Sequence, residues 1–171
     1  RQALDDPKLD KEVVAFFSLE MSAEQLATRI LAEQTEISSE KIRRGELSND
    51  DFHKLVRASQ RLERAPLYID DTPAITIAQL RTRVRRLMRQ QGLSLIVVDY
   101  LQLMRPGAGA RADNRVQEIS VITQSLKAVA KEFNVPVVAL SQLSRAVEQR
   151  EDKRPVLSLI HISEPTRRKR I

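Results

Sequence analysis

Four short apolar runs divide an otherwise amphipathic chain, at residues 13–17, 67–69, 95–98 and 137–140. They are rich in β-branched residues and do not alternate with polar ones, which is typical of strands covered on both faces. Segments of helical length separate them, and this order favours right-handed crossovers between parallel strands. The pattern therefore predicts an α/β fold with a mostly parallel sheet and flanking helices.

Polar residues mark the starts of the first two long helices. Ser22 stands three positions before Gln25, the spacing of a capping box, and predicts a helix through about residue 30 or beyond. Ser48 stands three before Asp51 and begins the next helix, whose apolar stripe includes Phe52, Leu55, Val56 and Leu62.

The third and fourth helices carry clearer apolar stripes. Thr76 precedes apolar positions 77, 80, 84, 87 and 88, which share one helical face, and Gly92 suits a left-handed turn at the end. Pro136 lies between the fourth helix and the predicted last strand. The buried stripe of that helix is predicted at Ile119, Ile122, Leu126, Val129, Ala130 and Phe133.

Composition narrows the class of protein. The chain has 171 residues, enough for one domain with a core. It lacks Cys and holds only His53 and His161, which argues against disulfides and zinc. No run approaches the roughly 20 apolar residues of a membrane span, and no signal peptide opens the sequence. We expect a cytoplasmic protein with no membrane partner.

The charge permits a nucleic-acid partner but supports one weakly. The formal net charge is +6, and half of that excess lies in residues 159–171. The outer face of the third helix carries Arg81, Arg85, Arg86 and Arg89, with Arg83 at its flank. These arginines could meet phosphates or an acidic partner. A solvated face or a subunit contact is the competing interpretation, and no interleaved aromatics suggest base stacking.

Three polar side chains follow predicted strands. Asp99 could hold Mg²⁺, directly or through water, beside nucleotide phosphates, in the manner of a Walker B carboxylate. Glu20 could polarise an attacking water, and Gln142 could donate to a phosphate oxygen. Taken singly, each has a simpler interpretation: a loop anchor, a carboxylate favoured at a helix start, and a surface amide. Their shared position at the carboxyl edge of one sheet favours a ligand site.

The phosphate cradle expected beside such residues is absent from the sequence. A P-loop requires G-x-x-x-x-G-K-[ST], and none of the glycines (Gly45, Gly92, Gly107 and Gly109) precedes a lysine. We therefore expect the chain by itself not to bind ATP tightly.

Several ordered motifs resemble one family. FFSLEM at 16–21, IVVDYLQLM at 96–104, NRVQEIS at 114–120 and LSQLSR at 140–145 are similar to DnaB-type bacterial replicative helicases, in a single register over about residues 1–158. The resemblance implies a RecA-like motor domain that works as a ring of six subunits. It also implies Mg²⁺-dependent ATP hydrolysis, movement on single-stranded DNA, and primase and a helicase loader as partners.

The same resemblance assigns roles to individual residues. Glu20 corresponds to the carboxylate that activates water, Asp99 to the Walker B ligand acting on Mg²⁺, and Gln142 to the γ-phosphate sensor. Loops 105–115 and 144–155 would face the central channel or neighbouring subunits. The DNA-contact candidates on these loops are Arg111, Arg115, Arg145 and Arg150.

The chain also departs from the family. The P-loop strand and helix are expected upstream of Arg1, and the arginine finger beyond the last residue. Residues 159–171 resemble nothing in the family and are interpreted as an artefactual extension, with a genuine basic tail as the alternative. The expected organisation is a partial RecA-like domain over 1–158, inactive in isolation.

Three other hypotheses stay open. The chain could come from another RecA-like ATPase, although the DYLQ string at 99–102 argues against this. It could be a non-catalytic basic module for nucleic-acid binding or assembly. It could also fail to fold stably, because a missing strand and helix would leave apolar sheet surface exposed.

Overall fold

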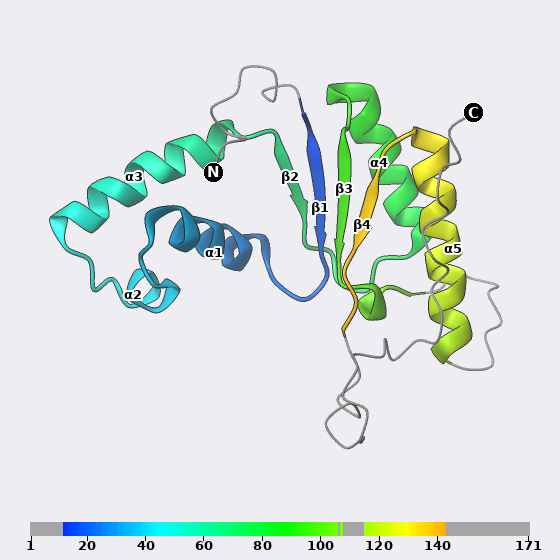
Figure 1. Ribbon diagram of the computed structural model, residues 1–171, viewed down its shortest axis with the longest axis horizontal. Coiled ribbons are helices and arrows are strands. Elements are labelled where there is room, and N and C mark those ends of the chain that lie inside the picture. Colours follow the sequence, from blue (N-terminus) through cyan, green and yellow to red (C-terminus); the bar gives the residue numbers. More distant parts are fainter. Residues whose placement is uncertain (1–11, 106, 108–114, 143–171) are drawn as a thin grey trace, which may run out of the picture.

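A four-stranded parallel sheet organises the molecule, and the computed structural model describes residues 12–105, 107 and 115–142 (Figure 1). The strand order is β2-β1-β3-β4, and every neighbouring pair is parallel. The predicted α/β class is confirmed, and each observed strand lies within one residue of its predicted bounds. The strands are β1 (Val14–Ser18), β2 (Leu67–Asp70), β3 (Leu95–Asp99) and β4 (Val137–Ala139).

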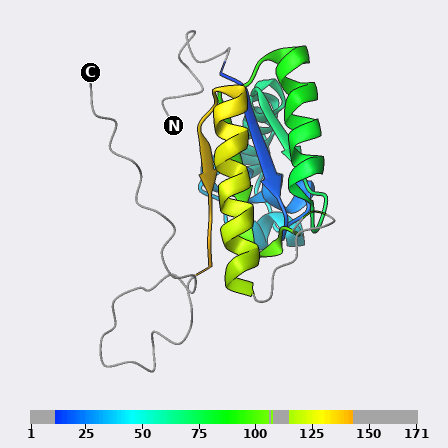
Figure 2. The same cartoon turned by 90° about the vertical axis from the view of Figure 1, so that its right-hand side faces the viewer.

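One face of the sheet carries the core. Helices α4 (Ile77–Gln91) and α5 (Arg115–Phe133) lie side by side on this face, as both views show (Figures 1 and 2). Alternate strand residues point toward the helices, because side chains along a strand alternate between faces. The predicted stripes on both helices are confirmed where they meet the sheet. The cluster includes Phe17, Ile96, Val98, Leu80, Val84, Ile122, Leu126 and Val129.

On the opposite face of the sheet, the described helices leave the strand residues only partly covered. The register aligns Phe16 with Ile69 and Val97, and Val97 with Val138. Val138 is 51% exposed, and the other three are only half-buried. The prediction that the strands are covered on both faces is therefore wrong for this face. The reason is that α4 and α5 both pack on the other side, while the remaining described helices pack chiefly against one another.

Those remaining helices form an arm beside the sheet, which we define as α1 (Ala23–Thr35), α2 (Ser39–Arg44) and α3 (Asn49–Arg64) (Figure 1). Ser22 and Ser48 cap α1 and α3 with the predicted capping boxes. None of the three helices has a buried residue, and Phe52 on the predicted α3 stripe is 58% exposed. Local capping therefore defines these helices more than core burial does.

Two local features differ from the predictions. The short helix α2 was not expected, because six residues are too few to establish a helical period; Ser38 caps it and Gly45 ends it at φ 71°. Gly92 has the expected positive φ of 78°, but its ψ of 173° is extended rather than left-handed helical. The extended ψ leads the chain directly into Leu93, which is buried at the start of the path to β3.

Candidate functional site

The carboxyl edge of the sheet collects the three candidate residues. Ser18 and Asp99 are register partners at the ends of β1 and β3, and Val98 pairs with Ala139 on β4. Glu20 is therefore two residues past the end of β1, Asp99 is the last residue of β3, and Gln142 is three residues past the end of β4. The fold thus brings all three to one edge, and their chemical roles stay predictions.

Three hydrogen bonds hold the turn that carries Glu20. The buried Ser18 hydroxyl donates to the Met21 carbonyl at 2.7 Å, and the Leu19 amide donates to the Asp99 carbonyl at 2.7 Å. The Ala23 amide donates to the Asp71 carboxylate at 2.9 Å, which attaches the start of α1 to the residue after β2. Glu20 itself is exposed, so a fixed backbone presents its carboxylate to solvent at the sheet edge.

Asp99 supplies a second carboxylate at this edge. It is half-buried, and the peptide bond that joins it to Tyr100 is cis. Carboxylate oxygens suit Mg²⁺, which proteins commonly hold through one or two carboxylates while phosphates and waters complete the shell. Within the described residues no group of three or more His, Cys, Asp or Glu side chains could hold a metal ion by itself. The Asp99 carboxylate is thus an oxygen donor of the kind that Mg²⁺ accepts, and the described residues form no closed protein cage around an ion.

The segment after β4 is held by a side chain from the segment after β3. Gln102 donates from its amide nitrogen to the Ser141 hydroxyl at 2.8 Å and to the Gln142 carbonyl at 3.1 Å. Its amide oxygen accepts from the Gln142 backbone N–H at 3.3 Å. Sequence reasoning missed this contact, because nothing in the apolar run around Gln102 marks a partner 40 residues away.

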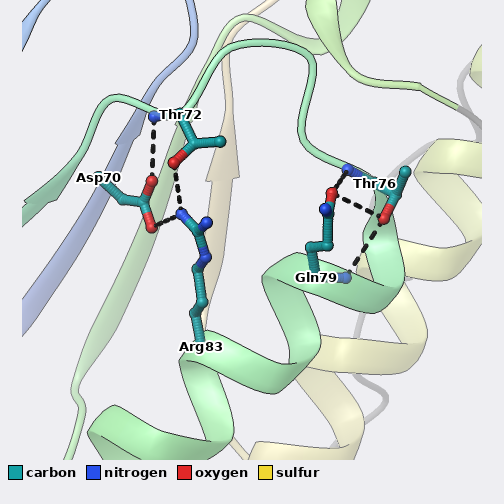
Figure 3. A network of polar contacts seen from close by, with 5 residues as sticks. All are labelled: Asp70, Thr72, Thr76, Gln79 and Arg83. Atoms are coloured by element: carbon teal, nitrogen blue, oxygen red, sulfur yellow. Dashed lines mark hydrogen bonds and ion pairs between the residues drawn. The ribbon is translucent and has the colours of Figure 1, made fainter.

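A second missed network lies where β2 ends. Asp70 accepts from Arg83 of α4 and from the Thr72 amide at 3.1 Å, and Arg83 also donates to the Thr72 hydroxyl at 2.7 Å (Figure 3). Partial burial by itself raises the pKa of Asp70, but the hydrogen bonds from Arg83 and Thr72 outweigh it and lower that pKa below its ordinary value. The sequence signal available for this network was the pair of aspartates, Asp70 and Asp71, directly after the predicted strand at 67–69.

The arginine face of α4 is used largely within the chain. Arg81 and Arg85 both pair with Glu132 of α5, at 2.6 and 2.7 Å, and Arg83 pairs with Asp70. Hydrogen bonds from Arg85 and Arg81 lower the pKa of Glu132. These contacts join α4 to α5 and to β2, which accounts for three of the five arginines without a nucleic-acid or subunit contact.

The DNA-contact candidates are mostly untested. Arg111, Arg145 and Arg150 lie outside the described residues, as does the whole of the predicted loop 144–155. Arg115 is not in a loop, which corrects the predicted boundary 105–115: it is the first residue of α5, whose helical period begins there. Its guanidinium pairs with Glu118 and donates to the Gln102 carbonyl.

Other features of the described residues lie away from this edge. A groove of about 750 Å³ runs between α1 and α3, and none of the three candidates lines it. Among residues 12–105, 107 and 115–142, no helix is long and apolar enough to cross a membrane.

Comparisons with known proteins agree with the geometry. Residues 3–165 match the family described as the DnaB-like helicase C terminal domain. Replicative DNA helicase DnaB of Rickettsia prowazekii (strain Madrid E) is 54% identical over 145 residues, covering 85% of this chain and 29% of that protein. The helicase of the same name from Geobacillus stearothermophilus is 52% identical over 152 residues, covering 89% of this chain and 33% of that protein.

Solved structures give the same assignment. A DnaB-like replicative helicase, studied with primase, superposes with a TM-score of 0.78 at 35% identity, covering 88% of this chain and 36% of that chain. An ATPase domain superposes with a TM-score of 0.77 at 36% identity, covering 86% of this chain and 52% of that chain. The chain spans about a third of the length of the two curated relatives above. The expected RecA-like fold is confirmed, and the chain belongs to the DnaB-like helicase C-terminal domain family.

Proposed function

We propose that this chain forms part of the motor domain of a replicative DNA helicase, which couples Mg²⁺-dependent ATP hydrolysis to movement on single-stranded DNA and to duplex unwinding. The observation that carries the proposal is the parallel register, which brings Glu20, Asp99 and Gln142 to one sheet edge in a chain of this family. In open α/β sheets that edge is where ligands bind.

The three residues have distinct proposed tasks. The exposed Glu20 carboxylate accepts a proton from the attacking water, as a general base held in place by the turn at Ser18. Asp99 holds Mg²⁺, directly or through water, and the bound ion neutralises charge on the nucleotide phosphates. Gln142 donates from its amide toward the γ-phosphate and links the nucleotide state to the chain that follows it.

The remaining parts of the nucleotide site are proposed to come from outside these 171 residues. The sequence has no G-x-x-x-x-G-K-[ST] motif, and the chain spans about a third of the length of the two curated relatives compared above. The homo-hexamer, single-stranded DNA, primase and loader are proposed partners of the whole protein. The boundary at residue 158 and the cytoplasmic location stay predictions, and the family match runs on to residue 165.

A hybrid helicase tests the proposal directly. The 152 matched residues of this chain replace the corresponding segment of the Geobacillus stearothermophilus protein, which supplies the rest of a full-length helicase. We expect the hybrid to hydrolyse ATP and to unwind a forked DNA duplex. Glu20→Gln should lower kcat for ATP hydrolysis by at least about 100-fold, as expected for loss of a general base.

A matched control separates catalysis from folding. Glu24→Gln makes the same chemical change on an exposed position in the first turn of α1 and should leave kcat within about twofold, as expected for a surface change. An active hybrid in which Glu20→Gln and Glu24→Gln behaved alike would remove Glu20 from the mechanism. A folded hybrid without ATP hydrolysis would contradict the helicase proposal itself. DNA binding that persists without ATP and weakens steeply with salt would then favour the non-catalytic binding module.

A further inference from the structure

We infer that Gln102 is a positioning residue for Gln142: its side-chain amide continues the β3–β4 hydrogen-bond ladder beyond the last strand residue and fixes the backbone from which the Gln142 side chain extends. This inference rests on the proposed function of Gln142 and adds a residue to that site. Gln102 does not itself contact the reacting atoms.

The backbone ladder between the two strands stops just before Gln142. The Leu140 amide donates to the Val98 carbonyl at 2.9 Å, and the Leu101 amide donates to the Leu140 carbonyl at 2.9 Å. The main chain of Leu101–Leu103 then turns into a short 3-10 helix, η2, with the Leu103 amide donating to the Tyr100 carbonyl. From that point the β3 backbone no longer runs beside the chain after β4.

Beyond the end of this backbone ladder, the side chain of Gln102 makes the hydrogen bonds to the chain after β4. A primary amide has a carbonyl acceptor, as a peptide unit has, and two N–H donors instead of one. Its oxygen accepts from the Gln142 N–H at 3.3 Å, and its nitrogen donates to the Gln142 carbonyl at 3.1 Å. Both main-chain groups of Gln142 are thereby satisfied by one side chain, and the 2.8 Å bond to Ser141 adds a third contact.

Gln102 is itself held in place by residues other than Ser141 and Gln142. It is half-buried, next to the buried Leu101, and its carbonyl accepts from Arg115 at the start of α5. The Gln142 side chain is exposed and makes no hydrogen bond to another residue of the described part of the chain. The backbone of Gln142 is thus held while its side-chain amide points to solvent, which is the arrangement that a preorganised phosphate-sensing group requires.

The placement of Gln102 also connects the proposed parts of the site. It follows Asp99 by three residues on one segment and contacts Gln142 on the other. A shift of the segment after β3 therefore moves the segment after β4, because two hydrogen bonds join the Gln102 side chain to the main chain of Gln142.

The test uses the hybrid helicase described above and two independent measurements. Gln102→Met keeps the length of the side chain and removes all three hydrogen bonds. Backbone hydrogen exchange should become roughly tenfold faster at the Gln142 amide, because a local bond that slows its exchange is lost. For ATP hydrolysis, kcat should fall roughly tenfold, within the range of coupling between contacting residues, while ADP affinity stays unchanged.

A double-mutant cycle shows whether Gln102 acts through Gln142. Gln142→Ala removes the proposed sensor, and adding Gln102→Met to it should lower kcat no further. Multiplying effects would mean that Gln102 acts separately and would overturn the inference. Unchanged exchange at Gln142 in Gln102→Met would overturn it equally.

Two further variants keep the outcomes distinct. Gln102→Glu places a carboxylate oxygen against the Gln142 carbonyl, and repulsion between the two oxygens should push the side chain away from the Gln142 main chain. Exchange at Gln142 should therefore again become faster and kcat should again fall. This variant replaces Gln102→Met if Gln102→Met does not melt cooperatively. Gln91→Met, on the exposed end of α4, should change neither. If the folded hybrid lacks ATPase activity, the proposed function fails, and exchange at Gln142 still decides whether Gln102 positions that residue.

Discussion

The sheet with α4 and α5 and the arm of α1–α3 are built from similar amphipathic helices, but they are held in different ways. Leu80 and Val84 of α4 and Ile96 of β3 have no exposed surface, whereas no residue of the three arm helices is buried. Both regions have complete capping boxes, at Thr76 in the first and at Ser22 and Ser48 in the second.

The difference separates two functions of a helical pattern. Caps and apolar spacing specify that a helix forms and where it starts, while burial supplies most of the free energy that keeps it in place. The Ala23–Asp71 hydrogen bond joins the arm to the residue after β2, and the three arm helices otherwise pack chiefly against one another. We therefore expect the arm to open at lower free energy than the core around α4.

The largest expected effect comes from matched leucine truncations in the two regions. Leu80→Ala leaves a cavity against the sheet and should cost about 2–5 kcal/mol of unfolding free energy, whereas Leu31→Ala on the half-buried face of α1 should cost below about 1.5 kcal/mol. Urea unfolding of the hybrid helicase, followed at the same protein concentration, measures both. Equal losses would mean that the arm is as tightly packed as the core.

The same contrast explains what the sequence could predict. The strands at 13–17 and 95–98 were predictable because these apolar runs are too short for helices and are enriched in β-branched or aromatic residues. Their parallel order placed Glu20, Asp99 and Gln142 at one edge. The open sheet face was expected only under the hypothesis that a strand and a helix are missing, and the apolar runs themselves did not indicate it. The apolar character of Phe16 and Val97 indicates a preference for burial, but it does not reveal which segment provides the cover.

Contacts between distant segments were the other limit. Gln102 lies in an apolar run and could equally face solvent, so its pairing with Gln142 follows only from the way η2 turns beside β4. Likewise, the helical spacing of the α4 arginines predicted a basic face on that helix. Only the packing of α5 showed that Glu132 forms ion pairs with two of them, Arg81 and Arg85.

An intermediate effect is expected from removing one cap in each region. Thr76→Ala and Ser48→Ala each remove a side-chain acceptor for an N-terminal amide, a change that typically costs about 1 kcal/mol. In Thr76→Ala the loss should appear in global unfolding, because α4 is part of the core. In Ser48→Ala it should appear mainly as faster hydrogen exchange in α3, with little change in the urea midpoint. A global loss in both variants would show that the arm and core unfold together.

The smallest effect concerns Asp70, which joins the core helix α4 to the strand next to the arm. Its pKa is lowered from the ordinary 3.8, so its stabilising contribution is complete above that value and is lost as the pH falls through the lower, folded pKa. Because the Arg83 side chain is 40% exposed, solvent screens the pair. Asp70→Asn should therefore cost at most about 1 kcal/mol near neutral pH.

The pH dependence separates this ion pair from a simple packing contact. The difference in urea stability between wild type and Asp70→Asn should be largest near pH 7 and should narrow as the pH falls below about 3.8, because the wild-type carboxyl then becomes neutral as well. A difference that stayed constant with pH would mean that Asp70 acts through shape and neutral hydrogen bonds rather than through the charge of Arg83. In that case the contacts of Asp70 would stabilise the fold as neutral hydrogen bonds do, as in the caps of the arm helices, and not through charge.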